Sequence, residues 1–167
     1  MKDSLNVAVA GATGYVGIQL IQILLKHAKI KILFLYANKT VGNKVKDFEN
    51  KAFKKKLPIV TKFKKADLYK VDVIFTALPN GEAQKIAKKL PDGVKLIDLS
   101  ADFRLNDFKL YKKWYGLNHK CKQLMKKSLY SITEFKRNNL QKSQIISCPG
   151  CYPTSIQIPL IPLIKNN

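Results

Sequence analysis

Arginine is nearly absent from this sequence. Only Arg104 and Arg137 occur among 31 basic residues, against 11 acidic ones, so the net charge of +20 comes almost entirely from lysines spread along the chain. A basic protein can bind nucleic acid through phosphate contacts. Arginine, however, is the side chain preferred for bidentate contacts with bases and phosphates. Its scarcity argues against that function, and we expect no nucleic-acid partner.

The sequence also has few cysteines and no long apolar run. Three cysteines, two of them within SCPGCYPTS (147–155), do not make a disulfide framework, which favours a reducing compartment. No apolar stretch approaches the roughly 20 residues that span a bilayer. The opening MKDSLNVAVAGATG does not resemble a secretory signal. We therefore expect a cytoplasmic protein without a membrane partner.

What the sequence does contain is an alternation of strand and helix patterns. Its 167 residues, 46% of them hydrophobic, suffice for a domain with a substantial core. Apolar runs predict strands at 6–10, 29–37, 57–63, 71–79, 94–100 and 144–147. Helices are predicted at 15–27, 81–90 and 133–140 (with Thr133 as N-cap), and loops with short helices at 38–56 and 101–127. This alternation indicates the α/β class and a Rossmann-like, doubly wound parallel sheet.

The last residues predict the start of a second structural unit. After Cys151 the chain reads YPTSIQIPLIPLIKNN, an apolar, helical-looking segment with no predicted element to pack against. We therefore divide the chain into a doubly wound α/β domain at 1–147 and the beginning of another domain at 148–167. On this interpretation the sequence is the N-terminal part of a longer protein.

A glycine-rich turn follows the first predicted strand directly. In GATGYVG (11–17) the glycines recur every third residue, and a predicted helix opens behind them. Glycines there allow a tight turn, close approach of a pyrophosphate and close helix packing, and the helix N-terminus attracts the anion. The alternative is a glycine-rich turn without a ligand. We favour a dinucleotide site made by Gly11, Ala12, Thr13, Gly14, Tyr15, Val16 and Gly17.

The end of the second predicted strand indicates which dinucleotide binds. NAD-specific domains place an acidic residue there for the ribose 2′-hydroxyl. Here the strand is followed by Asn38, Lys39 and Thr40, without Asp or Glu. A cation and a hydroxyl suit a 2′-phosphate, so the sequence predicts NADP (NADPH).

The residues alone allow four interpretations of Cys148 and Cys151. They could form a redox C-x-x-C pair, although such pairs normally follow the first strand of a small redox domain. They could join His119 and Cys121 in a zinc site, although the spacing is poor. Both could be buried packing residues. Alternatively, Cys151 opens a helix, whose N-terminus stabilises a nucleophilic thiolate.

Four motifs together resemble one enzyme family. GATGYVG (11–17), LIDLSADFRL (96–105), KWYGLNH (113–119) and PGCYPTS (149–155) occur in the order and at the separations seen in N-acetyl-gamma-glutamyl-phosphate reductases of arginine biosynthesis. The resemblance covers nearly the whole chain. SADFR and PGCYPT are specific, whereas the glycine turn alone would not be.

The resemblance implies an NADP-binding Rossmann domain followed by a catalytic domain akin to that of aspartate-semialdehyde dehydrogenase. It makes Cys151 the nucleophile that forms a thioester from an acyl phosphate, which NADPH then reduces to the semialdehyde. Ser100, within the SADFR motif, is predicted to be a cofactor-binding residue. Arg104 is a candidate for holding substrate phosphate or carboxylate, with a structural salt bridge as the alternative. Tyr152 is a candidate substrate residue, because its backbone amide lies at the helix start.

The sequence departs from the family at two positions and leaves alternatives open. Cys148 stands where the family has asparagine, and Ser131 where it has glycine. No metal is predicted, and neither His27 nor His119 is expected to be the general base, which the resemblance places beyond residue 167. We therefore expect this chain to be inactive by itself. The full-length protein is expected to be a homo-oligomer. The alternatives are another acyl-phosphate reductase or a non-enzymatic NADP sensor.

Overall fold

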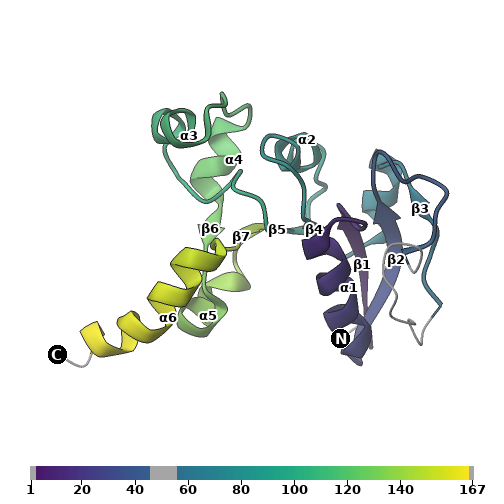
Figure 1. The fold of residues 1–167 in the computed structure, drawn as a ribbon, viewed down its shortest axis with the longest axis horizontal. Coiled ribbons are helices and arrows are strands. Elements are labelled where there is room, and N and C mark those ends of the chain that lie inside the picture. The colour runs from purple at the N-terminus through teal and green to yellow at the C-terminus, as the bar shows by residue number, and fades with distance from the viewer. Residues whose placement is uncertain (1–2, 46–55, 166–167) are drawn as a thin grey trace.

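The computed structural model describes residues 3–45 and 56–165 and contains one seven-stranded sheet (Figure 1). The strand order is β3-β2-β1-β4-β5-β7-β6, and every neighbouring pair is parallel. The strands are β1 (Leu5–Ala10), β2 (Ile30–Tyr36), β3 (Val60–Thr61), β4 (Val73–Thr76), β5 (Lys95–Asp98), β6 (Leu129–Tyr130) and β7 (Ile145–Ser147). The predicted parallel α/β sheet is thus confirmed.

Helices lie between the strands along the chain, and one more follows the last strand. They are α1 (Tyr15–Lys26), the 3-10 helix η2 (Lys65–Lys70), α2 (Ala83–Ala87), α3 (Phe108–Tyr115), α4 (Lys122–Lys127), α5 (Thr133–Leu140) and α6 (Cys151–Lys165). In Figure 1, α6 leaves the end of the sheet beside α5 and carries the C-terminus. None of the described helices has the length and apolar character needed to cross a membrane.

Two apolar clusters cover the two faces of the sheet, because successive strand side chains point to opposite faces. Val7 and Val9 of β1 pack in the cluster that contains the inner face of α1, represented by Ile21. Ala8 and Ala10 pack in the other cluster, which contains Ile86 of α2. Burial on both faces explains why these strands read as continuous apolar runs, and it makes the sheet doubly wound.

The carboxyl ends of the strands form a single row. The register pairs Ala10 with Thr76, Thr76 with Asp98, and Asp98 with Ser147. Because all strands run the same way, the segments after these residues emerge at one edge of the sheet. The strand order runs from β1 to β2 and β3 on one side and from β4 to β5 and β7 on the other, so the order reverses between β1 and β4. Ligands bind at such a switch point in open α/β sheets.

Several predicted details are wrong. β3 and β4 are shorter than predicted, and β6 and η2 were not predicted. The N-cap of α5 is Ile132, not Thr133, which is the first helical residue. Of the segment predicted as loop with a short helix, 46–55 lies outside the described residues.

Candidate active site

The turn after β1 is built around the backbone of Gly11. This residue has φ +87°, and an added Cβ would lie 2.1 Å from the carbonyl oxygen of Ala77. The amides of Gly11 and Ala12 both donate to the carbonyl of Tyr36, at 2.9 and 3.0 Å. The turn is therefore held between the ends of β2 and β4, and only glycine fits at its first position.

The other two glycines of the turn differ in what surrounds them. A Cβ on Gly17 would lie 2.0 Å from the carbonyl oxygen of Gly11, so α1 needs glycine there to pack on the turn. A Cβ on Gly14 would meet only ordinary van der Waals contact, with Gly11 O at 3.5 Å. No protein atom therefore demands glycine at position 14, where a missing side chain leaves room for a ligand.

The start of α1 presents an uncompensated helix N-terminus at this turn. Gly14 is the N-cap, no side chain caps the helix, and its first turn holds no acidic residue. Tyr15 and Val16 are exposed beside it. Free amides and the positive end of the helix dipole suit the pyrophosphate of a dinucleotide. The turn therefore fits the predicted cofactor.

The segment after β2 contacts the glycine turn through two hydroxyls. Thr40 Oγ1 and Thr13 Oγ1 are 2.9 Å apart. Asn38 lines a cleft next to the turn, whereas Lys39 is exposed and is not among the lining residues. The three residues predicted to surround a 2′-phosphate thus lie in different places, and their contacts with it remain a prediction.

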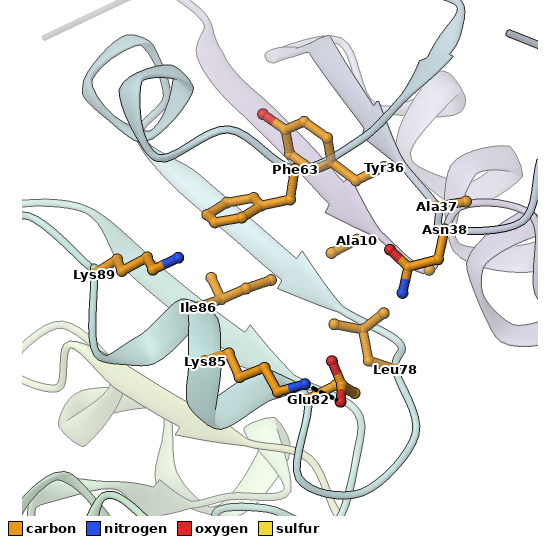
Figure 2. A pocket seen from close by; sticks show the side chains of 11 residues that line it. Ala10, Tyr36, Ala37, Asn38, Phe63, Leu78, Glu82, Lys85, Ile86 and Lys89 are labelled. Carbon is orange, nitrogen blue, oxygen red and sulfur yellow. Dashed lines mark hydrogen bonds and ion pairs between the residues drawn. The ribbon is translucent and has the colours of Figure 1, made fainter. Parts of the chain in front are cut away.

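A cleft of about 190 Å³ lies beside the glycine turn, at the carboxyl ends of β1, β2 and β4 (Figure 2). Phe63, Leu78 and Ile86 provide apolar walls. Lys85 and Lys89 of the α2 segment bring two ammonium groups to it. Apolar walls with a few convergent polar groups are typical of a cofactor pocket.

Sequence reasoning missed these two lysines. Lys85 forms an ion pair with Glu82, and Lys89 Nζ lies 5.7 Å from the centre of the Phe63 ring. Lys85 lies on α2 and Lys89 lies two residues after its end, and the sequence pattern alone does not show which side of residues 83–89 faces the cleft.

The second part of the site begins where β7 ends. Cys151 is the first residue of α6, as predicted, and is exposed together with Tyr152. The carbonyl of Gly150 accepts hydrogen bonds from Thr154 N at 3.0 Å and Thr154 Oγ1 at 2.9 Å. These bonds close the first turn of the helix and hold Cys151 at its N-terminus.

Cys148 lies in a different environment. Its amide donates to the carbonyl of Asp98 at 2.8 Å, and its side chain is half-buried. Burial, reinforced by the negative charge of Asp98, raises the pKa of the Cys148 thiol to about 11, against the opposing effect of Arg104. Cys148 is therefore a thiol at neutral pH.

The side chain of Arg104 contacts the segment that contains Cys148. Its Nε donates to the carbonyl of Cys148 at 3.0 Å and its Nη2 to the carbonyl of Leu99 at 3.1 Å. The third nitrogen, Nη1, lies against Gly150, 3.2 Å from where a Cβ would stand. The predicted structural salt bridge is not formed with any described residue. Carbonyl oxygens take its place, and substrate binding by Arg104 remains a prediction.

Two buried carboxylates organise the segment after β5. Asp98 accepts from Thr76 Oγ1 at 2.8 Å and from Ser100 Oγ at 2.9 Å, and burial raises its pKa. Asp102 accepts from Tyr111 OH at 2.6 Å and from Gly81 N at 2.6 Å. Ser100 is itself buried, so its predicted contact with a cofactor stays a prediction.

Of the two sequence departures, Cys148 has been described above and Ser131 lies at the end of β6. Ser131 is buried, and no described residue provides a hydrogen-bond partner for its hydroxyl. Its amide donates to the carbonyl of Ser147 at 3.1 Å, which joins the end of β6 to the end of β7.

The structure does not assemble the zinc alternative. His119 Nε2 lies 2.8 Å from the carbonyl oxygen of Asp102, and His119 Nδ1 accepts from Cys121 N at 3.1 Å. The Cys121 thiol donates to the carbonyl of Gln84 at 3.3 Å. Within residues 3–45 and 56–165, no group of three or more His, Cys, Asp or Glu side chains could hold a metal ion.

The glycine turn and Cys151 lie at the same edge of the sheet. β1 and β7 are three places apart in the strand order, which corresponds to about 14 Å at the usual strand separation. An extended dinucleotide anchored at the turn can cover such a distance along the row of strand ends. The geometry thus combines an anion-binding turn, a lined cleft and an exposed cysteine at a helix start.

Comparison with known sequences agrees with this geometry. Residues 6–143 match the family described as semialdehyde dehydrogenase, NAD binding domain. The chain is 45% identical over 166 residues to N-acetyl-gamma-glutamyl-phosphate reductase of Ehrlichia canis (strain Jake), covering 99% of this chain and 48% of that protein. It is 38% identical to the probable chloroplastic N-acetyl-gamma-glutamyl-phosphate reductase of Arabidopsis thaliana, covering 99% of this chain and 41% of that protein. The resemblance predicted from the motifs is confirmed, and the chain spans about half the length of these relatives.

Solved structures show the same fold. Aspartate semialdehyde dehydrogenase II from Vibrio cholerae, complexed with ASA, matches with a TM-score of 0.70 and 21% identity, covering 97% of this chain and 47% of that one. Aspartate semialdehyde dehydrogenase with NADP from Candida albicans matches with a TM-score of 0.67 and 20% identity, covering 98% and 47%.

Proposed function

This chain belongs to the semialdehyde dehydrogenase family, whose NAD-binding domain it contains, and from that premise we propose that it serves an NADPH-dependent N-acetyl-gamma-glutamyl-phosphate reductase. The observation that carries the proposal is the position of Cys151, exposed at the first turn of α6 and at the same sheet edge as the glycine turn. A cofactor-binding module without covalent chemistry has no need of an exposed cysteine there.

Cys151 is the proposed nucleophile. Its thiolate attacks the acyl carbon of the acyl phosphate, the C–S bond forms, and phosphate leaves with the electron pair of the broken C–O bond. The product on the protein is a thioester. Backbone amides at the start of α6, including that of Tyr152, are the candidates to stabilise the oxyanion of the intermediate.

The glycine turn and the cleft beside it are proposed to hold NADPH, which when bound supplies hydride to the thioester. Gly14 and the free start of α1 receive the pyrophosphate, and the apolar walls around Leu78 receive the adenine end. Lys85 and Lys89, rather than Lys39, are the cations that line the cleft and favour the 2′-phosphate.

Substrate anions are proposed to bind on the side of the cysteine loop, which we define as residues 148–151. Two nitrogens of Arg104 donate to carbonyl groups and the third, Nη1, lies beside Gly150, and we assign a phosphate or carboxylate of the substrate to Nη1. On this proposal residues 148–167 begin the catalytic domain, and 1–147 form the dinucleotide-binding domain.

We do not assign the role of general acid or base to either histidine of this chain. His27 caps the end of α1, at the edge of the sheet opposite to Cys151, because α1 runs back from the glycine turn. His119 is buried with both ring nitrogens hydrogen-bonded to backbone groups. We therefore expect little turnover from this chain alone, and we propose a cytoplasmic homo-oligomer for the complete enzyme.

Trapping the proposed thioester tests the function on the chain itself. The protein is incubated with N-acetyl-gamma-glutamyl phosphate without cofactor, quenched in acid and mapped by mass spectrometry. We expect the acyl group on Cys151, and none in Cys151→Ser. Acylation of Cys121 or Cys148 instead, or equal labelling of the Ser variant, would contradict the proposal. An acyl phosphate with a shorter chain distinguishes the related reductases.

A further inference from the structure

We propose that Arg104 is a positioning residue that fixes the cysteine loop through the backbone carbonyl of Cys148 and thereby sets the reactivity of Cys151. This role rests on the proposed function of Cys151 as the nucleophile. It is distinct from the contact with substrate assigned above, because it operates when no substrate is bound.

The guanidinium group of Arg104 bonds to two separate segments of backbone. Arg104 Nε donates to Cys148 O at 3.0 Å, while Nη2 donates to Leu99 O at 3.1 Å. Leu99 follows β5 and Cys148 follows β7, so one rigid, planar side chain joins the ends of two neighbouring strands. The ammonium group of a lysine is a single point and lacks the fork that makes both bonds in this geometry.

The backbone of Cys148 is hydrogen-bonded through both its amide and its carbonyl. Its amide donates to the carbonyl of Asp98 at 2.8 Å, while its carbonyl accepts from Arg104. Only Pro149 and Gly150 separate this fixed peptide from Cys151. Because proline restricts its own φ and the conformation of Cys148, movement of the Cys148 peptide passes directly to the start of α6.

Arg104 also lies against Gly150 of the cysteine loop. A Cβ at position 150 would lie 3.2 Å from Arg104 Nη1 and 3.7 Å from Cζ, so the guanidinium would have to shift by a few tenths of an ångström. Gly150 is not in the positive-φ region, so the backbone alone does not require glycine there. Its lack of a side chain instead lets Arg104 lie against the cysteine loop.

Two measurements on the Arg104→Lys variant, both made without substrate, test this role. The first is the rate of iodoacetamide labelling at Cys151, and the second is hydrogen exchange of the Cys148 amide. Loss of the carbonyl bonds leaves the cysteine loop and the start of α6 less fixed around Cys151, so we expect labelling of Cys151 at neutral pH to fall about two- to fivefold. Exchange of the Cys148 amide should accelerate. Gly150→Ala keeps the charge and should change both in the same direction, to a smaller extent.

Arg137→Lys is the matched control. Arg137 is the only other arginine of the chain and is exposed on α5, so its replacement should leave both measurements unchanged. Circular dichroism and thermal unfolding confirm that each variant is folded. If Arg104 merely bound substrate, neither labelling nor exchange would change in Arg104→Lys, and that result would overturn the proposal.

The design separates this inference from the proposed function. If Cys151 of the unaltered protein fails to label ahead of Cys121 and Cys148, the assignment of the nucleophile is wrong. Exchange at Cys148 still decides whether Arg104 fixes the loop: faster exchange in Arg104→Lys supports the contact, and equal exchange refutes it.

Discussion

An added Cβ on Gly17 would lie 2.0 Å from the carbonyl oxygen of Gly11, a distance at which the backbone must move. At Gly14, three residues earlier, a Cβ would meet only ordinary contact at 3.5 Å. The same motif therefore contains two glycines required by the fold, Gly11 and Gly17, and a third, Gly14, that leaves space beside the predicted pyrophosphate.

Alanine at these two positions should affect different properties, stability at position 17 and cofactor binding at position 14. Gly17→Ala should lower the free energy of unfolding by about 1–3 kcal/mol, because the helix is forced off the turn. Gly14→Ala should cost less than about 1 kcal/mol but weaken NADPH binding about tenfold. Urea unfolding and calorimetric titration measure the two quantities. An equal loss of stability in both variants would contradict this distinction.

The sequence predicted the fold where local pattern and global structure agree. Residues 6–10 were predicted as a strand because they are apolar on both faces, and β1 is buried on both faces. β6 was missed because it contains only Leu129 and Tyr130, too few for a period to show. Its pairing with β7 comes from the tertiary arrangement.

The sequence also predicted some residues of the candidate site and missed others. The helix start at Cys151 was predictable, because a glycine and an apolar helical segment flank it. The contacts of Arg104 were not, because its partners are backbone carbonyls, which every residue carries and no sequence pattern distinguishes. Lys85 and Lys89 were missed because only the packing of the α2 segment shows which side faces the cleft.

Cofactor preference should depend on the lysines of the cleft. We expect the protein to bind NADPH more tightly than NADH, and the double variant Lys85→Gln/Lys89→Gln to lose about fivefold or more for NADPH with little change for NADH. Lys39→Gln is the matched control, since Lys39 does not line the cleft, and its effect should be smaller. Parallel titrations with both cofactors decide. Equal or tighter NADH binding by the unaltered protein would contradict the prediction.

Cys151 should be the first cysteine to react with iodoacetamide at neutral pH. It is exposed at a helix start, whereas burial raises the pKa of Cys121 and raises that of Cys148 to about 11. Because the thiolate is the reactive form, labelling of Cys148 should rise only as the pH approaches that value. Residue-resolved mass spectrometry over a pH series gives the three rates. Faster labelling of Cys121 or Cys148 at neutral pH would show that the order is wrong.

His119 should make stability depend on pH. Burial lowers its pKa from 6.5, so the unfolded chain binds more protons than the folded one below that value. The stability supplied by the neutral ring is therefore complete above pH 6.5 and is lost as the pH falls through the lower folded-state pKa. The raised pKa of Asp98 acts in the opposite sense, because the folded state then holds the extra proton.

Comparison with His119→Asn isolates the histidine, since Asp98 is common to both proteins. We expect the stability advantage of the unaltered protein over the variant to shrink by about 1.4 kcal/mol for each pH unit between 6.5 and the lowered pKa of His119. Urea unfolding at about pH 7.5 and about pH 5 measures it. An advantage that is constant, or that grows in acid, would contradict the prediction.

Cys148 and Cys151 form a C-x-x-C pair, and such a pair could form a disulfide under oxidation. Peroxide would first convert the Cys151 thiolate to a sulfenic acid, and a thiolate at Cys148 would then displace water to form the S–S bond. Burial and the charge of Asp98 raise the pKa of Cys148 to about 11, so its thiolate is scarce at neutral pH. Its backbone is also held by Asp98 and Arg104. We therefore expect Cys148 to pack in place of asparagine rather than to resolve oxidation.

Mild peroxide treatment of the protein and of Cys148→Asn tests this expectation. Both should lose the Cys151 thiol at similar rates, and mass spectrometry should show sulfinic acid at Cys151 in both, because neither forms a protective disulfide. Dithiothreitol should restore the labelling of Cys151 to the same small extent in each. A disulfide in the parent protein alone, with full recovery of the Cys151 thiol, would instead make Cys148 a resolving cysteine. It would also require the cysteine loop to leave the contacts with Asp98 and Arg104 that hold it in this structure.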